Sequence, residues 1–318
     1  MALTRRDFGK LALSAVPAVL TVPALAQTTT TGRPNSVING VNVGTITYSY
    51  RAMPDQSAEA ILRYVVDSGI SQIEFMGGPV EAFAGAPPRP AGPGRGVQPT
   101  TEQQAAQREH AARLRAWRTS ASMDRFKALR KIFNDAGVTI YAWKQLDPNM
   151  TDEEIEYVFG VAEALGNTHV TLELVEDAAQ LKRLGPMGEQ RKIFVAYHTH
   201  LQGSLTAFDQ AFAASKANMA NVDLGHYVAA GGDPVAFLNR HHARIASFHL
   251  KDRTTPANGQ KNLPWGTGDT PLAQILQTVK KNGWKMPATI ELEYDVPAGS
   301  NAVKEVVRCF EFCRRALA

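Results

Sequence analysis

Five acidic or histidine side chains recur along this 318-residue chain with regular spacing. They are Glu173, His198, Asp223, His249 and Glu291, and successive members are 25, 25, 26 and 42 residues apart. If they converge, the carboxylates among them repel one another unless a cation lies between them. Mixed carboxylate and imidazole ligands with open positions suit a divalent cation, so the pattern predicts one bound metal ion. Mn²⁺ is the first choice, and Mg²⁺, Co²⁺, Fe²⁺ or Zn²⁺ also fit.

Each of these side chains stands near the end of a short β-rich run. The runs cover residues 41–48, 71–77, 138–143, 168–174, 193–200, 220–226, 244–252 and 288–294. Amphipathic stretches lie between them, and several of these end in glycine, the usual helix stop. Eight strand–helix units in succession predict a single-domain α/β protein, a (β/α)8 TIM barrel over residues 41–318. The alternative is that the five side chains are separate polar groups, each hydrogen-bonded at its own strand end.

Strand alternation indicates which side chains share the barrel interior with these five. The residues two positions earlier point the same way, and all are small or polar: Thr171, Ala196, Asn221, Ser247 and Thr289. Bulky branched side chains usually fill a barrel interior. We therefore expect space beneath the converging ligands.

Further residues near the strand ends are candidates for substrate binding, each with a structural alternative. Lys251 can steady an oxyanion or be a solvated lysine, and Trp265 can stack on a sugar ring or anchor its loop. His226 fits a secondary ligand or a turn residue. The full set of substrate-binding candidates is His200, Lys251, Glu74, Lys144, Trp265 and His226.

The amino-terminal residues predict export. "TRRDFGK" precedes a short apolar run that ends in "ALA", which resembles a twin-arginine signal peptide over residues 1–26. Residues 27–40 are expected to be a disordered linker, and the site of action is expected to be the periplasm. The alternative is an amphipathic first helix. The net charge of +4 gives no footprint for nucleic acid or for a membrane surface after signal cleavage.

Several motifs together resemble the xylose-isomerase-like TIM-barrel superfamily, often labelled sugar phosphate isomerase/epimerase. They are "AYHTH", "NVDLGHYVAAGGDP", "RIASFHLKDR", "NLPWGTGDTPL" and "ATIELEY". The resemblance implies a divalent metal bound by Asp223, His249 and Glu291. A glutamate usually ends the fifth strand in such epimerases, but this chain has His198 there. The fourth ligand is therefore either Glu173 or His198.

The resemblance implies a metal-dependent sugar isomerase or epimerase that removes a proton next to a carbonyl. The metal would stabilise the enediolate, Glu291 or Glu173 would be the base, and His198 or another group would complete the acid/base pair. A 3-keto-glycoside lyase acting by β-elimination is the alternative of the same fold. Two other classes are an abasic-site endonuclease and a non-catalytic sugar-binding barrel. The partner would be a small carbohydrate, and a homo-oligomer is compatible with the sequence.

Overall fold

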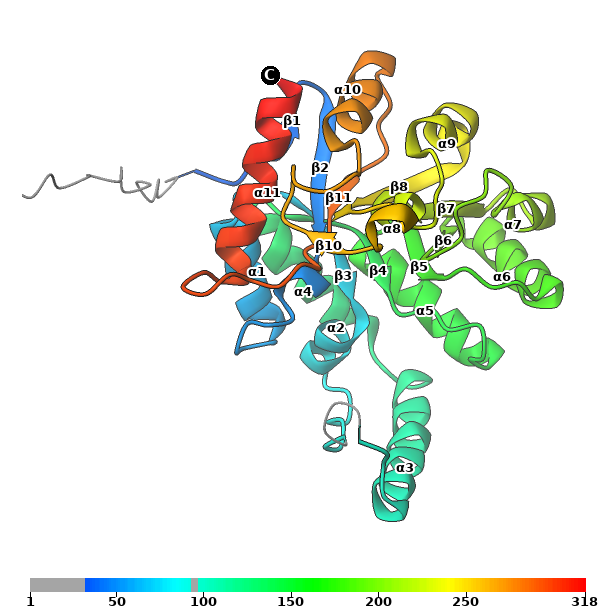
Figure 1. Ribbon diagram of the computed structural model, residues 1–318. Helices are drawn as coiled ribbons and strands as arrows, with labels where there is room; N and C mark the ends of the chain where they lie inside the picture. The colour runs from blue at the N-terminus through cyan, green and yellow to red at the C-terminus, as the bar shows by residue number, and fades with distance from the viewer. Residues whose placement is uncertain (1–31, 93–96) are drawn as a thin grey trace, which may run out of the picture. The chain divides into compact units, whose positions relative to one another are not determined.

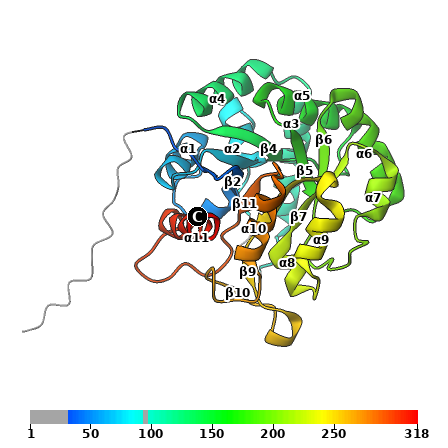
Figure 2. The same ribbon diagram turned by 90° about the horizontal axis from the view of Figure 1, so that it is seen from above.

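The protein is described by a computed structural model that covers residues 32–92 and 97–318. Within this part, Arg33–Ala318 forms one compact unit. Eight parallel strands close into a barrel with helices outside it (Figures 1 and 2). In ring order they are β2 (Val41–Ile46), β3 (Gln72–Met76), β4 (Thr139–Lys144), β5 (His169–Glu173), β6 (Phe194–His198), β7 (Asn218–Asp223), β8 (Ile245–Leu250) and β11 (Ala288–Ile290). All eight predicted runs form barrel strands, which confirms the predicted fold.

The helices follow the strands as the amphipathic stretches predicted. They are α1 (Ala58–Asp67), α2 (Gly77–Ala84), α3 (Thr101–Arg118), α4 (Met123–Asp135), α5 (Asp152–Leu165), α6 (Ala178–Arg191), α7 (Asp209–Ala214), α8 (Leu224–Ala229), α9 (Pro234–His241), α10 (Leu272–Asn282) and α11 (Ala302–Leu317). In α11, Val306, Cys309, Phe310 and Cys313 are buried at the 3–4-residue spacing of a core-facing helix. No helix among the described residues is both long enough and apolar enough to span a membrane.

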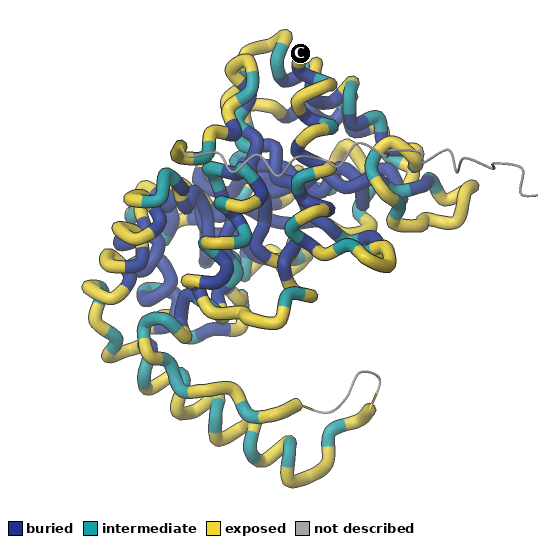
Figure 3. Tube along the Cα trace, turned by 90° about the vertical axis from the view of Figure 1, so that its left-hand side faces the viewer, coloured by how far each residue is buried: buried dark blue, intermediate teal, exposed yellow. Residues whose placement is uncertain are grey.

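Helix α3 departs from the regular barrel unit. It belongs to the insertion between α2 and α4. Figures 1 and 3 show it extending away from the ring of barrel helices, with most of its surface exposed. A capping box between Thr100 and Gln103 starts the helix, and the buried Arg118 ends it. The carboxyl end of α3 thereby contacts the barrel, whereas its amino-terminal turns do not contribute to the core.

Part of the segment expected to be a linker is ordered instead. Strand β1 (Val37–Ile38) pairs antiparallel with β2, and Asn39–Gly40 joins them with positive φ angles of 47° and 84°. Ser36 is buried and donates a hydrogen bond to the carbonyl of Val43. "NG" between apolar residues is a strong hairpin signal, so this hairpin was predictable from the sequence. The predicted signal peptide, residues 1–26, lies outside the described residues.

The interior beneath the predicted ligands is filled, contrary to the expectation of space. The register between β3 and β4 shifts near Glu74, so that β4 carries one extra residue there. Tyr141, on β4, reaches across the barrel and its hydroxyl lies 2.6 Å from Oγ1 of Thr289. Glu74 and His169 are also completely buried here. Polar side chains joined by hydrogen bonds therefore occupy the volume that the small residues leave.

Candidate active site

Four of the five predicted ligands converge at the carboxyl end of the barrel. His198 ends β6, Asp223 ends β7, His249 lies in β8, and Glu291 directly follows β11. One possible ligand atom from each lies within 4.8 Å of the others, and all four residues are buried. We call His198, Asp223, His249 and Glu291 the donor group. Their strands are neighbours in the sheet, which explains why one βα spacing brings the side chains together.

Asp223 has one oxygen engaged and one without a hydrogen bond. Its Oδ1 caps α8 by accepting from the backbone N–H of His226 at 2.7 Å. Its Oδ2 is buried and accepts no hydrogen bond from any residue in the described part of the chain, although Nζ of Lys251 lies 3.0 Å away. Burial raises the pKa of Asp223 to about 6, against the opposing effect of Lys251. A buried carboxylate oxygen that accepts no hydrogen bond is available to bind a metal ion.

His249 lies between two carboxylates. Its Nδ1 is 2.7 Å from Oε2 of Glu291, and its Nε2 is 2.8 Å from Oε2 of Glu74. Burial alone would lower the pKa of His249, but Glu74 and Glu291 together raise it to about 10. Without a metal the ring is therefore an imidazolium that neutralises its neighbours. With a metal it would give up one proton and use that nitrogen as a ligand.

Lys251 is the second cation within this cluster. Its Nζ lies 3.0 Å from Oε2 of Glu291 and 2.6 Å from Oε2 of Glu293, in addition to its contact with Asp223. The side chain is almost fully buried, which would lower its pKa, but the three carboxylates raise the pKa instead. Glu293 was not among the residues predicted from the sequence, although it has the same strand parity as Glu291.

The donor group fits a divalent cation. Two imidazoles and two carboxylates are a common ligand set for Mn²⁺, Fe²⁺, Co²⁺ and Zn²⁺. Four carboxylates, those of Glu74, Asp223, Glu291 and Glu293, contact the two cationic side chains His249 and Lys251, so negative charge is in excess at this site. The structure places His198 in this group, whereas Glu173 lies with His198 and His200 in a second, more exposed set of possible ligand atoms that also lie within 4.8 Å of one another.

The family model for xylose isomerase-like TIM barrels matches residues 96–313. The chain belongs to this family. No curated protein matches the sequence. Among solved structures, a probable 3-DHS dehydratase from Bacillus anthracis is 15% identical with a TM-score of 0.59, over 85% of this chain and 98% of that one. A sugar phosphate isomerase/epimerase from Parabacteroides distasonis is 16% identical (TM-score 0.55, 86% and 93%). An L-ribulose 3-epimerase is 12% identical (TM-score 0.57, 87% and 94%). At these identities, the likeness shows the fold alone.

In this xylose isomerase-like barrel, Glu173 lies at the rim of the site. Its Oε1 is 2.7 Å from Nζ of Lys144, and its Oε2 is 3.2 Å from Nδ1 of His200. We call Glu173 and His200 the rim pair. Burial opposes ionisation of Glu173, but His200 and Lys144 outweigh it and lower its pKa. The ring centroid of His200 is 5.2 Å from that of His198, so the rim pair borders the donor group.

His226 and Glu74 lie in positions that the sequence did not predict. The His226 ring, on α8, faces Nζ of Lys251 at 3.0 Å and also contacts the guanidinium of Arg253. Burial and these two cations lower its pKa to about 2, so the ring is neutral. Glu74 is completely buried and contacts His249 from below. In this position Glu74 holds the ring of His249 by a hydrogen bond and has no contact with solvent.

Trp265 belongs to the loop after β8. This loop begins with a short hairpin formed by β9 (Asp252–Arg253) and β10 (Asn262–Leu263). Its ring packs against Phe312 of α11 at 5.8 Å between centroids. Asp252 is buried, and its Oδ2 accepts from the backbone N–H groups of Gly266, Thr267 and Gly268. Trp265 therefore anchors its loop against α11, and Asp252 caps the turn that follows Trp265.

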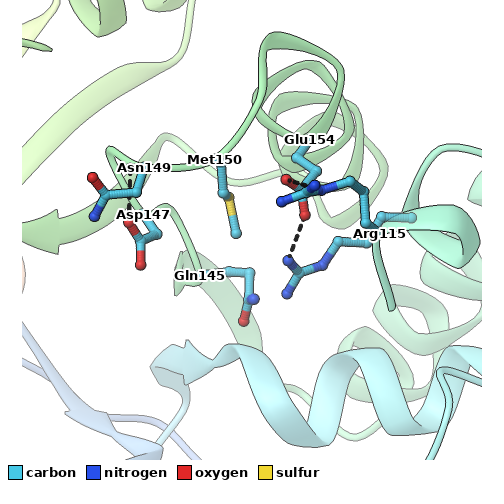
Figure 4. A pocket seen from close by; sticks show the side chains of 7 residues that line it. Arg115, Gln145, Asp147, Asn149, Met150 and Glu154 are labelled. Carbon is cyan, nitrogen blue, oxygen red and sulfur yellow. Dashed lines mark hydrogen bonds and ion pairs between the residues drawn. The ribbon is translucent and has the colours of Figure 1, made fainter. Parts of the chain in front are cut away.

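A separate hollow lies where α3 meets the loop that follows β4 (Figure 4). Arg118 and Arg115 both contact Glu154 there, with N–O distances of 3.2 Å. The lining residues are Arg115, Arg118, Gln145, Asp147, Asn149, Met150 and Glu154. None of the side chains singled out from the sequence belongs to this lining, so the hollow is distinct from the donor group.

Proposed function

We propose that this protein is a metal-dependent carbohydrate isomerase or epimerase that removes a proton from a carbon next to a carbonyl. The convergence of His198, Asp223, His249 and Glu291 within 4.8 Å is the observation that carries the proposal. A divalent cation held there would act as a Lewis acid on neighbouring sugar oxygens. The family's fold and its epimerase neighbour agree with a small carbohydrate as the substrate.

The chain's own residues suit the handling of protons. Both cationic contacts of Glu291, from His249 and Lys251, are made to Oε2, so we assign Oε1 as the atom that takes the substrate proton. Lys251 adds positive charge where an oxyanion would develop. We assign the return of the proton to the rim pair, because His198 is engaged within the donor group and Glu173 lies 3.2 Å from His200.

Turnover in D₂O tests this proposal. A panel of keto-sugars and keto-glycosides is incubated with metal-loaded protein, and products are analysed by mass spectrometry and NMR. Proton abstraction places deuterium on the carbon next to the carbonyl. Efficient turnover of any substrate by hydrolysis, without exchange at that carbon, would exclude the proposed reaction while leaving the metal site intact.

A lyase is the second candidate, and the identity of residue 198 favours it. The resemblance to epimerases of this superfamily implies a glutamate at the end of the fifth barrel strand, where this chain has His198, so the donor group offers only one glutamate, Glu291, as base. Elimination needs one base and an acid for the leaving group, a demand that Glu291 and the rim pair meet. An unsaturated product from a 3-keto-glycoside would identify this reaction in the same panel.

The site of action we propose is the periplasm, reached through a twin-arginine signal. The motif "TRRDFGK" supports this, and it lies outside the described residues. Replacing Arg5 and Arg6 with Lys should leave the protein in the cytoplasm of a fractionated bacterial host. Periplasmic protein at the unmodified level would contradict the proposal.

A further inference from the structure

The two imidazoles of the donor group are joined by one buried side-chain amide. Asn221, on β7, lies between His198 and Glu74 and has no exposed surface. Its Oδ1 is 2.9 Å from Nδ1 of His198, and its Nδ2 is 3.2 Å from Oε2 of Glu74. Glu74 in turn lies 2.8 Å from Nε2 of His249. A continuous path of hydrogen bonds therefore runs from one imidazole to the other.

The direction of these hydrogen bonds follows from chemistry. Nδ2 of Asn221 also donates to Oγ of Ser247 at 2.6 Å. An ionised carboxylate only accepts, so the Asn221 amide must direct its nitrogen toward Glu74 and Ser247. Its oxygen then faces His198 and accepts from Nδ1–H. This leaves Nε2 of His198 with a lone pair, the form in which imidazole binds a metal.

Glu74 fixes the other ring in the same way. Its carboxylate also accepts from the hydroxyl of Thr171 at 2.7 Å, and it has no exposed surface. The amide nitrogen of Asn221 and the ring of His249 also face this carboxylate, so three donors surround its two oxygens. Both ring nitrogens of His249 face a carboxylate, Nε2 that of Glu74 and Nδ1 that of Glu291, but only Nδ1 lies on the side of the donor group, so a metal there would displace the Nδ1 proton while Glu74 keeps the Nε2 proton. Nδ1, which faces Glu291 and Asp223, is then the atom left for a metal.

We propose that Asn221 and Glu74 are positioning residues that set which nitrogen of His198 and of His249 faces the metal. The proposal rests on the donor group being a metal site. It also gives Glu74 a role distinct from the substrate contact expected from its strand-end position. Hydrogen-bond partners of metal-bound histidines commonly change metal affinity about 10- to 100-fold when they are removed. Because Asn221 contacts both His198 and Glu74, its loss should affect both rings.

The experiment measures metal affinity and ring tautomers separately. Chelator-treated wild-type, Asn221→Leu and Glu74→Gln proteins are titrated with Co²⁺ in competition with a chromophoric chelator. Thr289→Val is the matched control, because it removes an equally buried hydrogen bond, to Tyr141, that touches neither imidazole. Histidine-selective ¹⁵N NMR of the metal-free proteins reports the tautomer of His198, with its signals assigned by a His198→Gln variant.

We expect Co²⁺ affinity about 100-fold weaker in Asn221→Leu, about 10-fold weaker in Glu74→Gln, and unchanged in Thr289→Val. We also expect the Nδ1–H tautomer of His198 in the wild type and its loss in Asn221→Leu. Glu74→Gln keeps the shape of the side chain, so it reports affinity even if Asn221→Leu fails to fold. Unchanged affinity in folded Glu74→Gln, or an Nε2–H tautomer of His198 in the wild type, would overturn the inference. Absence of Co²⁺ binding by the wild type would instead reject the metal site itself.

Discussion

Glu291 and Glu173 both stand at strand ends at the mouth of the barrel, yet their surroundings differ. The Glu291 side chain is 7% exposed and contacts His249 and Lys251, whereas the Glu173 side chain is 52% exposed and contacts Lys144 and His200. Both carboxylates have lowered pKa values, because nearby cations outweigh the effect of burial. In the donor group, however, water does not screen the charges, so its geometry is fixed by direct contacts.

This difference separates two tasks. Buried polar groups must be hydrogen-bonded or paired, so each residue of the donor group is held in one orientation before any ligand arrives. The rim pair is open to solvent and to a substrate, and its contacts contribute little to stability. We therefore assign the proposed metal binding to the donor group, and the rim pair is suited to exchanging protons with substrate or water.

The largest expected effect comes from Glu291→Gln. An amide cannot take a proton, so turnover should fall about 10²- to 10⁴-fold, with loss of deuterium exchange from D₂O. The measurement is kcat under saturating substrate and metal, with metal content determined on the same sample. Exchange at the wild-type rate in a metal-loaded variant would remove Glu291 from the role of base.

Lys251→Met should destabilise the metal-free protein by about 3–5 kcal/mol. The change removes a buried cation that contacts the carboxylates of Asp223, Glu291 and Glu293, so part of their buried negative charge is no longer balanced. Urea unfolding with chelator present gives the loss, and the same titration with excess Mn²⁺ should show a larger metal-induced stabilisation than in the wild type. If chelator-treated variant and wild type unfold at the same urea concentration, Lys251 does not balance these charges.

Lowering the pH should reduce the free energy of unfolding, because His169 is buried in the folded protein and resists protonation there. Burial lowers its pKa to about 4, against about 6.5 in an unfolded chain, so between these values only the unfolded chain takes up a proton. From pH 7 to pH 5 this coupling removes about 2 kcal/mol of stability. His169→Gln should lose that much less than the wild type over the same interval, measured by urea unfolding with chelator present. Identical losses in both proteins would show that His169 titrates normally.

The smallest effect is expected from Glu173→Gln. Exposed ion pairs contribute at most about 1 kcal/mol, so Mn²⁺ affinity should change less than about fivefold. Asp223→Asn, titrated alongside it, should weaken Mn²⁺ binding far more. If Glu173→Gln weakened Mn²⁺ binding as much as Asp223→Asn, Glu173 would be one of the metal ligands, and the donor group and the rim pair would not have separate roles.

Strand alternation explains why the barrel could be predicted from the sequence. The eight runs change from a two-residue to a helical period at regular intervals, and neighbouring parallel strands bring equivalent positions together. The hairpin of β1 was equally visible in Asn39–Gly40 and was missed. The contact between Glu74 and His249 could not be predicted, because the residues are 175 positions apart and meet only when the barrel closes.

The filled interior has a similar explanation. Parity predicts which side chains point inward only while every strand is regular. The register shift near Glu74 allows Tyr141 to enter the barrel, and a single sequence gives no sign of that shift. The places of Glu173 at the rim and of His198 inside the site likewise depend on side-chain reach across neighbouring strands, which residue spacing does not give.

Equilibrium metal binding by the chelator-treated protein tests the central claim most directly. Isothermal titration of the chain with Mn²⁺, repeated with Zn²⁺, should show one saturable site per chain. The site should disappear in a His249→Ala, Glu291→Gln double variant and persist in Glu173→Gln. No saturable binding in the wild type, or full binding in the folded double variant, would contradict the account.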